Sequence, residues 1–105
     1  MYKLCFFVPE DFVEDVKQAV FAAGAGRIGN YEQCCWQVKG QGQFKPLPGS
    51  QPFLGRQNEL ERVNEYRVEM VMQENLATEV IQALKRAHPY EAPAYEVMAL
   101  IDVPS

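Results

Sequence analysis

The residues best suited to chemistry form a short cluster, His88-Pro89-Tyr90-Glu91, at the end of a helical pattern. The imidazole of His88 titrates near neutral pH and binds metals, and the Glu91 carboxylate could pair with it or share a divalent cation. Alternatively, His88 caps helix carbonyls, Pro89 ends the helix and Tyr90 fills the core. A metal site at His88 and Glu91 would need at least two more ligands. Within the chain, these could come only from Cys34, Cys35, Glu69, Glu96 or Asp102, unless a neighbouring subunit supplies them.

A second candidate is the glycine-rich segment 24–29, which fits the pattern G-x-G-x-x-G. The dinucleotide-binding form of this motif follows a strand and opens a helix, whereas this segment follows a helical pattern and leads into a strand. Its glycines predict a chain reversal with positive φ, and its amides could form an anion-binding nest beside Arg27. The predicted ligand-binding residues are Gly26, Arg27, Gly29, Asn30 and Tyr31, together with His88, Tyr90 and Glu91.

Nothing in the sequence is typical of a catalytic site. There is no G-x-S-x-G motif, and Cys34 with His88 is the one nucleophile–base pair that the chain offers. No neighbouring residue indicates an activated thiol at Cys34. The sequence therefore predicts a protein that is not an enzyme, with a Cys34-dependent enzyme as the weaker hypothesis.

Two similar strand–helix units must position these residues. The run Tyr2–Val8 is short and apolar, as in a strand, and apolar residues recur at helical spacing over 12–23, with Asp11 and Glu14 placed for a capping box. A shift of 64 residues superimposes this unit on a second one. The second unit predicts a strand over 66–72 and a helix over 76–87, ended by Pro89.

Two further strands complete the pattern, at 33–39 and at 95–103. The order β-α-β-β-α-β predicts a ferredoxin-like α+β fold in a single domain, 1–105, with one antiparallel sheet and both helices on one face. Segment 40–65 is rich in Gly, Pro and Gln. We interpret it as an extended arm between the second and third strands that packs on a neighbouring subunit, or alternatively as a surface loop.

Composition excludes several classes of protein. The 105 residues are 48% hydrophobic and carry a net charge of −4 with a pI near 4.9, which is typical of one globular domain and argues against general binding to nucleic acid. The apolar run before Pro9 is too short for a membrane span or a secretory signal. Three cysteines argue against a disulfide framework, so we expect a reduced, cytoplasmic protein.

Four segments resemble the small PII-like/CutA-like domain inserted in proteins of the NGG-interacting-factor-three (Nif-three) family. The resemblance implies a ferredoxin-like fold and assembly through the sheets. Larger members of that family carry a second domain with a two-metal site of His and Glu ligands, which this sequence lacks, so the chain resembles the insert standing alone. The segments are 24–34, 40–55, 61–71 and 87–96.

The resemblance and the residues together predict a homo-oligomeric module of unknown biological role. We expect a dimer or trimer, formed through the open sheet face and the 40–65 arm, that binds a small ligand or partner at clefts between subunits in the manner of PII-like sensors. No cofactor is expected beyond a divalent metal ion in the alternative function. That alternative is CutA-like binding of copper or zinc through His88 and Glu91.

Overall fold

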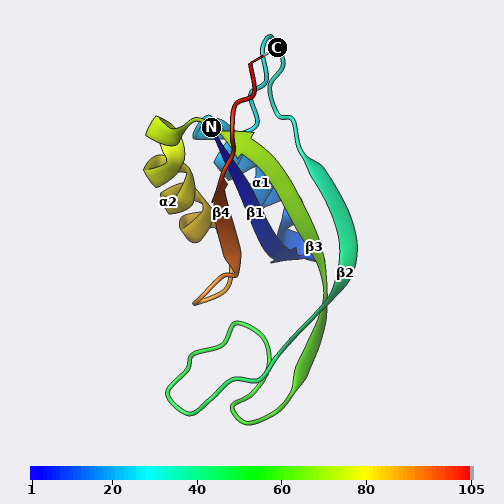
Figure 1. Cartoon of the computed structure of the whole chain (residues 1–105). Helices are drawn as coiled ribbons and strands as arrows, with labels where there is room; N and C mark the ends of the chain where they lie inside the picture. Colours follow the sequence, from blue (N-terminus) through cyan, green and yellow to red (C-terminus); the bar gives the residue numbers. More distant parts are fainter. Residues whose placement is uncertain (105) are drawn as a thin grey trace.

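The structure, a computed structural model, describes residues 1–104. A four-stranded antiparallel sheet has the strand order β2-β3-β1-β4, with two helices packed on one of its faces (Figure 1). This confirms the predicted ferredoxin-like order of elements. The elements are β1 (Tyr2–Pro9), the 3-10 turn η1 (Glu10–Phe12), α1 (Val13–Ala22), β2 (Trp36–Phe44), β3 (Glu61–Met72), the 3-10 turn η2 (Glu74–Leu76), α2 (Ala77–Ala87) and β4 (Tyr95–Ala99).

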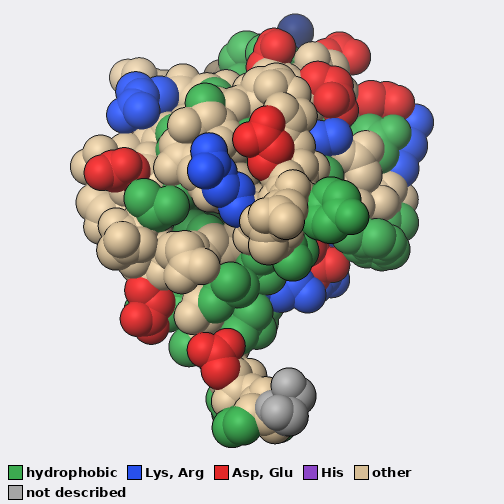
Figure 2. All heavy atoms as spheres, turned by 90° about the horizontal axis from the view of Figure 1, so that it is seen from above, with side chains coloured by type: hydrophobic (Ala, Val, Ile, Leu, Met, Phe, Trp, Pro, Cys, Tyr) green, Lys and Arg blue, Asp and Glu red, His purple; other side chains and the backbone are tan. Residues whose placement is uncertain are grey.

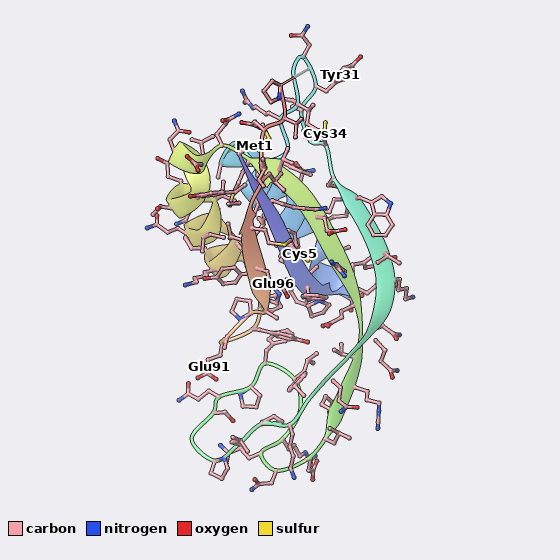
Figure 3. All side chains as sticks on the ribbon, in the orientation of Figure 1. Met1, Cys5, Tyr31, Cys34, Glu91 and Glu96 are labelled. Carbon is pink, nitrogen blue, oxygen red and sulfur yellow. The ribbon has the colours of Figure 1, made fainter. Side chains whose placement is uncertain are left out.

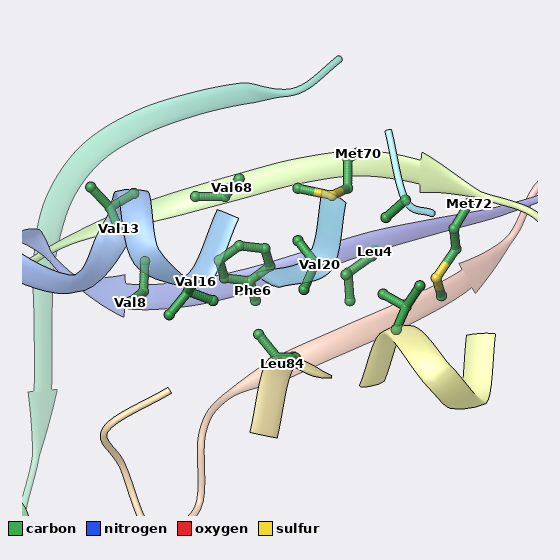
Figure 4. Packing of buried hydrophobic residues seen from close by; sticks show 12 residues of the cluster. Leu4, Phe6, Val8, Val13, Val16, Val20, Val68, Met70, Met72 and Leu84 are labelled. Atoms are coloured by element: carbon green, nitrogen blue, oxygen red, sulfur yellow. The ribbon is translucent and has the colours of Figure 1, made fainter. Parts of the chain in front are cut away.

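The core lies between the helices and the sheet (Figure 4). Alternation along β1 turns Leu4, Phe6 and Val8 toward the helices, and these three side chains are fully buried. The helical spacing predicted for α1 is confirmed, because its buried residues fall on one face. The helices and β3 contribute Val13, Val16, Val20, Val68, Met70, Met72, Val80 and Leu84 to this core.

The two ends of the sheet carry different connections. Strands β1 and β3 are antiparallel, and each is followed by a helix that runs back along it, so α1 and α2 finish at opposite ends of the sheet (Figure 1). We call the end that carries residues 24–34 the glycine-turn end. The other end carries residues 45–60 and 88–94, and we call it the arm end.

Strand β2, at one edge of the sheet, and its neighbour β3 are longer than the sequence predicts. Strand β2 begins at Trp36 rather than at residue 33 and continues to Phe44, while β3 begins at Glu61. Gln33 has a positive φ of 60°, so the extended chain starts only after it. Residues 40–44 and 61–65 therefore pair as strands, and the irregular part of the predicted arm shrinks to residues 45–60, which we call the arm loop.

Two other boundaries correct the sequence analysis. Strand β4 ends at Ala99, short of the predicted residue 103. The predicted capping box is wrong, because Asp11 lies in the turn η1 and α1 begins after it without a side-chain cap. Glu14 instead forms an ion pair with Lys17 at 2.9 Å. Within residues 1–104, neither helix is long and apolar enough to cross a membrane.

Candidate functional site

The glycine turn is held by its own backbone. Gly24, Gly26 and Gly29 all have positive φ, as predicted for a chain reversal. The amide of Gly26 donates to the carbonyl of Val71 at 2.8 Å, and its carbonyl accepts from the amide of Cys34 at 2.8 Å. The amides of Gly24 and Ala25 also donate to carbonyls of α1. An anion-binding nest is therefore not formed at 24–26, because these amides are already satisfied.

The tip of this turn projects into solvent. Ile28 and Tyr31 pair with each other through two 2.9 Å backbone hydrogen bonds, and Tyr31 is 75% exposed. Arg27, Gly29 and Asn30 are exposed as well. Seen from this end, the surface mixes acidic, basic, hydrophobic and uncharged polar groups (Figure 2). The predicted residues here form an open tip rather than an enclosed site.

His88 lies at the opposite end and is buried, with 5% of its surface exposed. Its Nε2 lies 2.6 Å from the carbonyl oxygen of Phe7, and its Nδ1 accepts from the amide of Tyr90 at 3.1 Å. Since a carbonyl only accepts, Nε2 carries the proton and the ring is neutral. Burial lowers the pKa of His88, which favours the same neutral form. The alternative in which the His88 side chain caps helix carbonyls is therefore wrong, because the ring links the end of α2 to the Phe7 carbonyl of β1.

The predicted metal pair is not assembled. Glu91 Oε2 accepts from the amide of Gln51 at 2.9 Å, so its carboxylate faces the arm loop rather than His88. Both ring nitrogens of His88 are engaged, and a cation would have to displace one of these hydrogen bonds. Among residues 1–104, no three His, Cys, Asp or Glu side chains gather as a metal site would require. Binding of copper or zinc thus stays a prediction that this geometry does not support.

The arm end contains a cavity of about 260 Å³, which we call the arm pocket. Tyr90, predicted to bind a ligand or alternatively to fill the core, lines this pocket. Its ring packs against Phe44 at 5.7 Å and against His88 at 5.0 Å between centroids. Its hydroxyl oxygen is buried and makes no hydrogen bond with the described residues. The lining comprises Phe7, Gln43, Phe44, Pro46, Ser50, Pro52, Phe53, Leu54, Glu65, Tyr90, Glu91, Ala92 and Ala94.

Glu65 is an ionisable residue of this pocket that was not predicted from the sequence. Burial raises the pKa of its carboxyl group. Burial also raises the pKa of the Tyr90 hydroxyl group, and the negative charges of Glu65 and Glu61 raise it further. A Cβ atom at Gly42 would overlap the Glu65 carboxylate, so glycine at 42 leaves the space that this carboxylate occupies. Glu65 sits beside Pro9 and Gly40 in the sheet, and only the strand register reveals this placement.

A single chain does not unite the predicted ligand-binding residues. Tyr31 lies above the sheet and Glu91 lies beyond the lower end of β4, so the two are far apart (Figure 3). Gly26, Arg27, Gly29, Asn30 and Tyr31 belong to the glycine-turn end, while His88, Tyr90 and Glu91 belong to the arm end. The cause is the antiparallel course of α1 and α2, which releases the chain at opposite ends of the sheet. These two groups could meet only across two copies.

No protein-family model matches the chain. It is 44% identical over 100 residues to a protein of Halalkalibacterium halodurans named GTP cyclohydrolase 1 type 2 homolog, covering 95% of this chain and 27% of that protein. A protein of the same name from Mycobacterium tuberculosis is 45% identical over 102 residues, covering 97% of this chain and 27% of the relative. The chain therefore spans about a quarter of the length of these curated relatives.

Solved structures agree with both the fold and this partial coverage. A Bacillus cereus protein related to NIF3 superimposes with a TM-score of 0.82 and 40% identity, covering 96% of this chain and 26% of that one. CutA1 from Pyrococcus horikoshii superimposes with a TM-score of 0.70 at 17% identity, over 99% of this chain and 87% of that one. The PII-like protein CutA from Nostoc gives a TM-score of 0.67 at 15% identity, over 95% of this chain and 81% of its own. At these identities, the CutA proteins show the fold alone.

Proposed function

Since the chain is homologous to a quarter-length segment of NIF3-related proteins and has the CutA-like, PII-like ferredoxin fold, we propose that it is a self-associating binding module that is not an enzyme. The word cyclohydrolase in the relatives' name describes whole proteins, of which the matched segment makes up 27%. Cys34 and His88, the one nucleophile–base pair considered, lie at opposite ends of the sheet. Their separation supports a binding role.

The observation that carries this proposal is the face of the sheet away from the helices, which we call the outer face. Cross-strand pairing places Trp36 opposite Glu69, and Val38 opposite Arg67, on this face. Trp36 is 60% exposed and Val38 is 45% exposed. Large exposed apolar side chains that lie two residues apart on the same face of one strand are typical of protein interfaces.

At the centre of the outer face, one side chain is already buried and the charged groups beside it are paired. Cys5 is fully buried there although no helix covers it, and burial raises the pKa of its thiol. Glu69 accepts from Arg67 at 3.3 Å and lies 3.4 Å from the Lys3 ammonium group. Because these three charges are paired within one chain, covering this part of the face with a second copy costs less than covering unpaired charges would. This supports the outer face, with the adjoining arm, as the contact between copies.

The test is the molar mass of the protein by light scattering during size-exclusion chromatography. We expect a dimer or trimer at micromolar concentration, and a monomer for Trp36→Glu, since a carboxylate at this position would be desolvated in the interface. Tyr31→Glu is the matched control, because it changes an aromatic residue of similar exposure at the tip of the glycine turn. A folded monomeric wild type, or a Trp36→Glu variant with wild-type mass, would contradict the proposal.

We also propose a cytoplasmic, reducing location. Cys5, Cys34 and Cys35 are all free thiols, which suits a compartment that keeps cysteines reduced. Cell fractionation with an antibody against the chain tests this directly. Recovery of the protein in an oxidising compartment would refute it.

A further inference from the structure

We propose that the arm pocket binds a small organic ammonium ion with an apolar, aromatic body. Three features meet there: aromatic side chains, a carboxylate with no cation beside it, and a buried hydroxyl group that lacks a partner. This inference concerns residues of a single chain. Its residues are Phe44, Phe53, Glu65 and Tyr90.

The walls of the pocket favour a cation. Phe7, Phe44, Phe53 and Tyr90 contribute four aromatic rings, whose faces attract positive charge. The ionisable groups that line it are acidic or phenolic, and no Lys, Arg or His lines it. His88 stands behind the Tyr90 ring as a neutral imidazole. The charges that line the pocket, Glu65 and Glu91, therefore attract a cation and repel an anion.

The polar atoms narrow the class of cation to one that can donate hydrogen bonds. The Tyr90 hydroxyl is buried without a partner among the described residues, and its oxygen accepts from an ammonium N–H only when a small shift of the ring opens it to the pocket. The Glu65 carboxyl group is partly desolvated, so a bound ammonium ion would form a charge-assisted hydrogen bond with it. A quaternary ammonium ion would feel the aromatic rings but could satisfy neither oxygen. A primary amine is therefore the better fit.

The pocket is small and its walls are held in place. A cavity of about 260 Å³ lies just below the range of roughly 300–1,000 Å³ that is usual for drug-sized ligands, so the ligand is compact. Phe53 packs edge-on against Phe12 at 5.4 Å, which anchors the arm loop to the start of α1. The hydrogen bond from the Gln51 amide to Glu91 ties the same loop to residues 88–94. Such preorganisation lowers the entropy lost on binding.

The experiment is a calorimetric titration of the whole chain with three compounds of matched size at about pH 7. Phenethylammonium is the cation, phenethyl alcohol the neutral analogue and hydrocinnamate the anion. We expect the cation to bind at least about tenfold more tightly than the alcohol, since a hydrogen bond between charged groups supplies this much, and the anion not to bind. Equal affinity for the cation and the alcohol, or no binding of the cation at millimolar concentration, would overturn the proposal.

Variants assign the affinity to the named atoms. Glu65→Gln keeps the shape of the side chain and should weaken binding of phenethylammonium about tenfold or more, while Tyr90→Phe should weaken it several-fold. Glu32→Gln is the matched control, because it removes one exposed carboxylate at the glycine-turn end. Unchanged affinity in both pocket variants would refute the assignment, as would equal weakening by Glu32→Gln.

A lysine side chain of a second copy carries the same ammonium chemistry, and dilution separates these two sources. If a neighbouring copy fills the pocket, the affinity for phenethylammonium will rise as the protein is diluted and the copies dissociate. A free small amine as the natural occupant predicts an affinity independent of protein concentration. An affinity for phenethylammonium that rises as the protein is diluted would overturn the small-ligand proposal, while leaving the proposal of self-association intact.

Discussion

The two ends of the sheet differ in how their polar groups are satisfied. At the glycine-turn end, backbone amides and carbonyls bond to one another, and the predicted side chains project into water. At the arm end, His88 and the Tyr90 hydroxyl are buried, and partial burial raises the pKa of the Glu65 carboxyl group. The glycine motif thus forms a turn whose backbone groups bond to one another. The arm loop helps to form a pocket in which the Tyr90 hydroxyl lacks a hydrogen-bond partner among the described residues.

The largest expected effect is a loss of stability from a change at the arm end. His88→Ala removes a buried ring that bonds both the Phe7 carbonyl and the Tyr90 amide. We expect the free energy of unfolding in urea to fall by about 3 kcal/mol, because two buried polar groups lose their partner and a cavity opens. Tyr31→Ala at the other end should change it by less than about 0.5 kcal/mol. Similar losses in the two variants would show that the ends do not differ in burial as described.

The next effect distinguishes the base of the glycine turn from its tip. Gly26 has a φ of 81°, and an added Cβ would lie 2.8 Å from the Phe21 ring and 3.0 Å from the Cys34 carbonyl oxygen. Gly26→Ala should therefore lower the free energy of unfolding by about 2 kcal/mol, from backbone strain and steric overlap. At Gly29 the added atom meets open space, so Gly29→Ala should cost about 1 kcal/mol from the positive φ alone. An equal loss of unfolding free energy in the two variants would contradict the tight packing around Gly26.

A dependence on pH should also arise at the arm end. The pKa of His88 is lowered from its ordinary value of 6.5 by burial, so its contribution to stability is present above that value. It is lost as the pH falls through the lowered pKa, because a proton on Nδ1 removes the acceptor of the Tyr90 amide. Chemical unfolding between about pH 7 and pH 5 should show this loss, and His88→Gln should lack it. An unchanged slope in His88→Gln would assign the dependence to other groups.

The smallest effect concerns Glu65. Burial raises the pKa of Glu65, so its charged form disfavours folding once the pH exceeds the ordinary value for glutamate. Glu65→Gln should therefore stabilise the free protein at neutral pH, by no more than about 1 kcal/mol, and this gain should vanish below about pH 4. Thermal unfolding at the two pH values measures it. Destabilisation at neutral pH would mean that the carboxylate already has a stabilising partner.

Much of the fold follows from the sequence because the repeated strand–helix unit is encoded locally. The alternation of Tyr66, Val68, Met70 and Met72 predicts the inward face of β3 correctly, since burial on one side of a strand requires a period of two. Residues 40–44 were not predicted as a strand, because glycine and glutamine have low β propensity and only pairing with 61–65 extends them. Tertiary pairing therefore overrode local preference.

The candidate site was predicted only in part, for a related reason. His88, Tyr90 and Glu91 were grouped because they are adjacent in sequence, and the structure does place them at the arm end. Glu65 was missed because its approach to Tyr90 depends on strand register. The separation of the two site halves could have been anticipated, because helices that follow antiparallel strands must end on opposite sides.

Amide NMR mapping with phenethylammonium tests the contrast between the two ends most directly. We predict concentration-dependent shifts of the backbone amides of Phe44, Glu65 and Tyr90, with those of Gly26 to Tyr31 unchanged. Shifts confined to the glycine turn, or spread evenly over the chain, would contradict the claim that the arm end is where this protein binds its ligand.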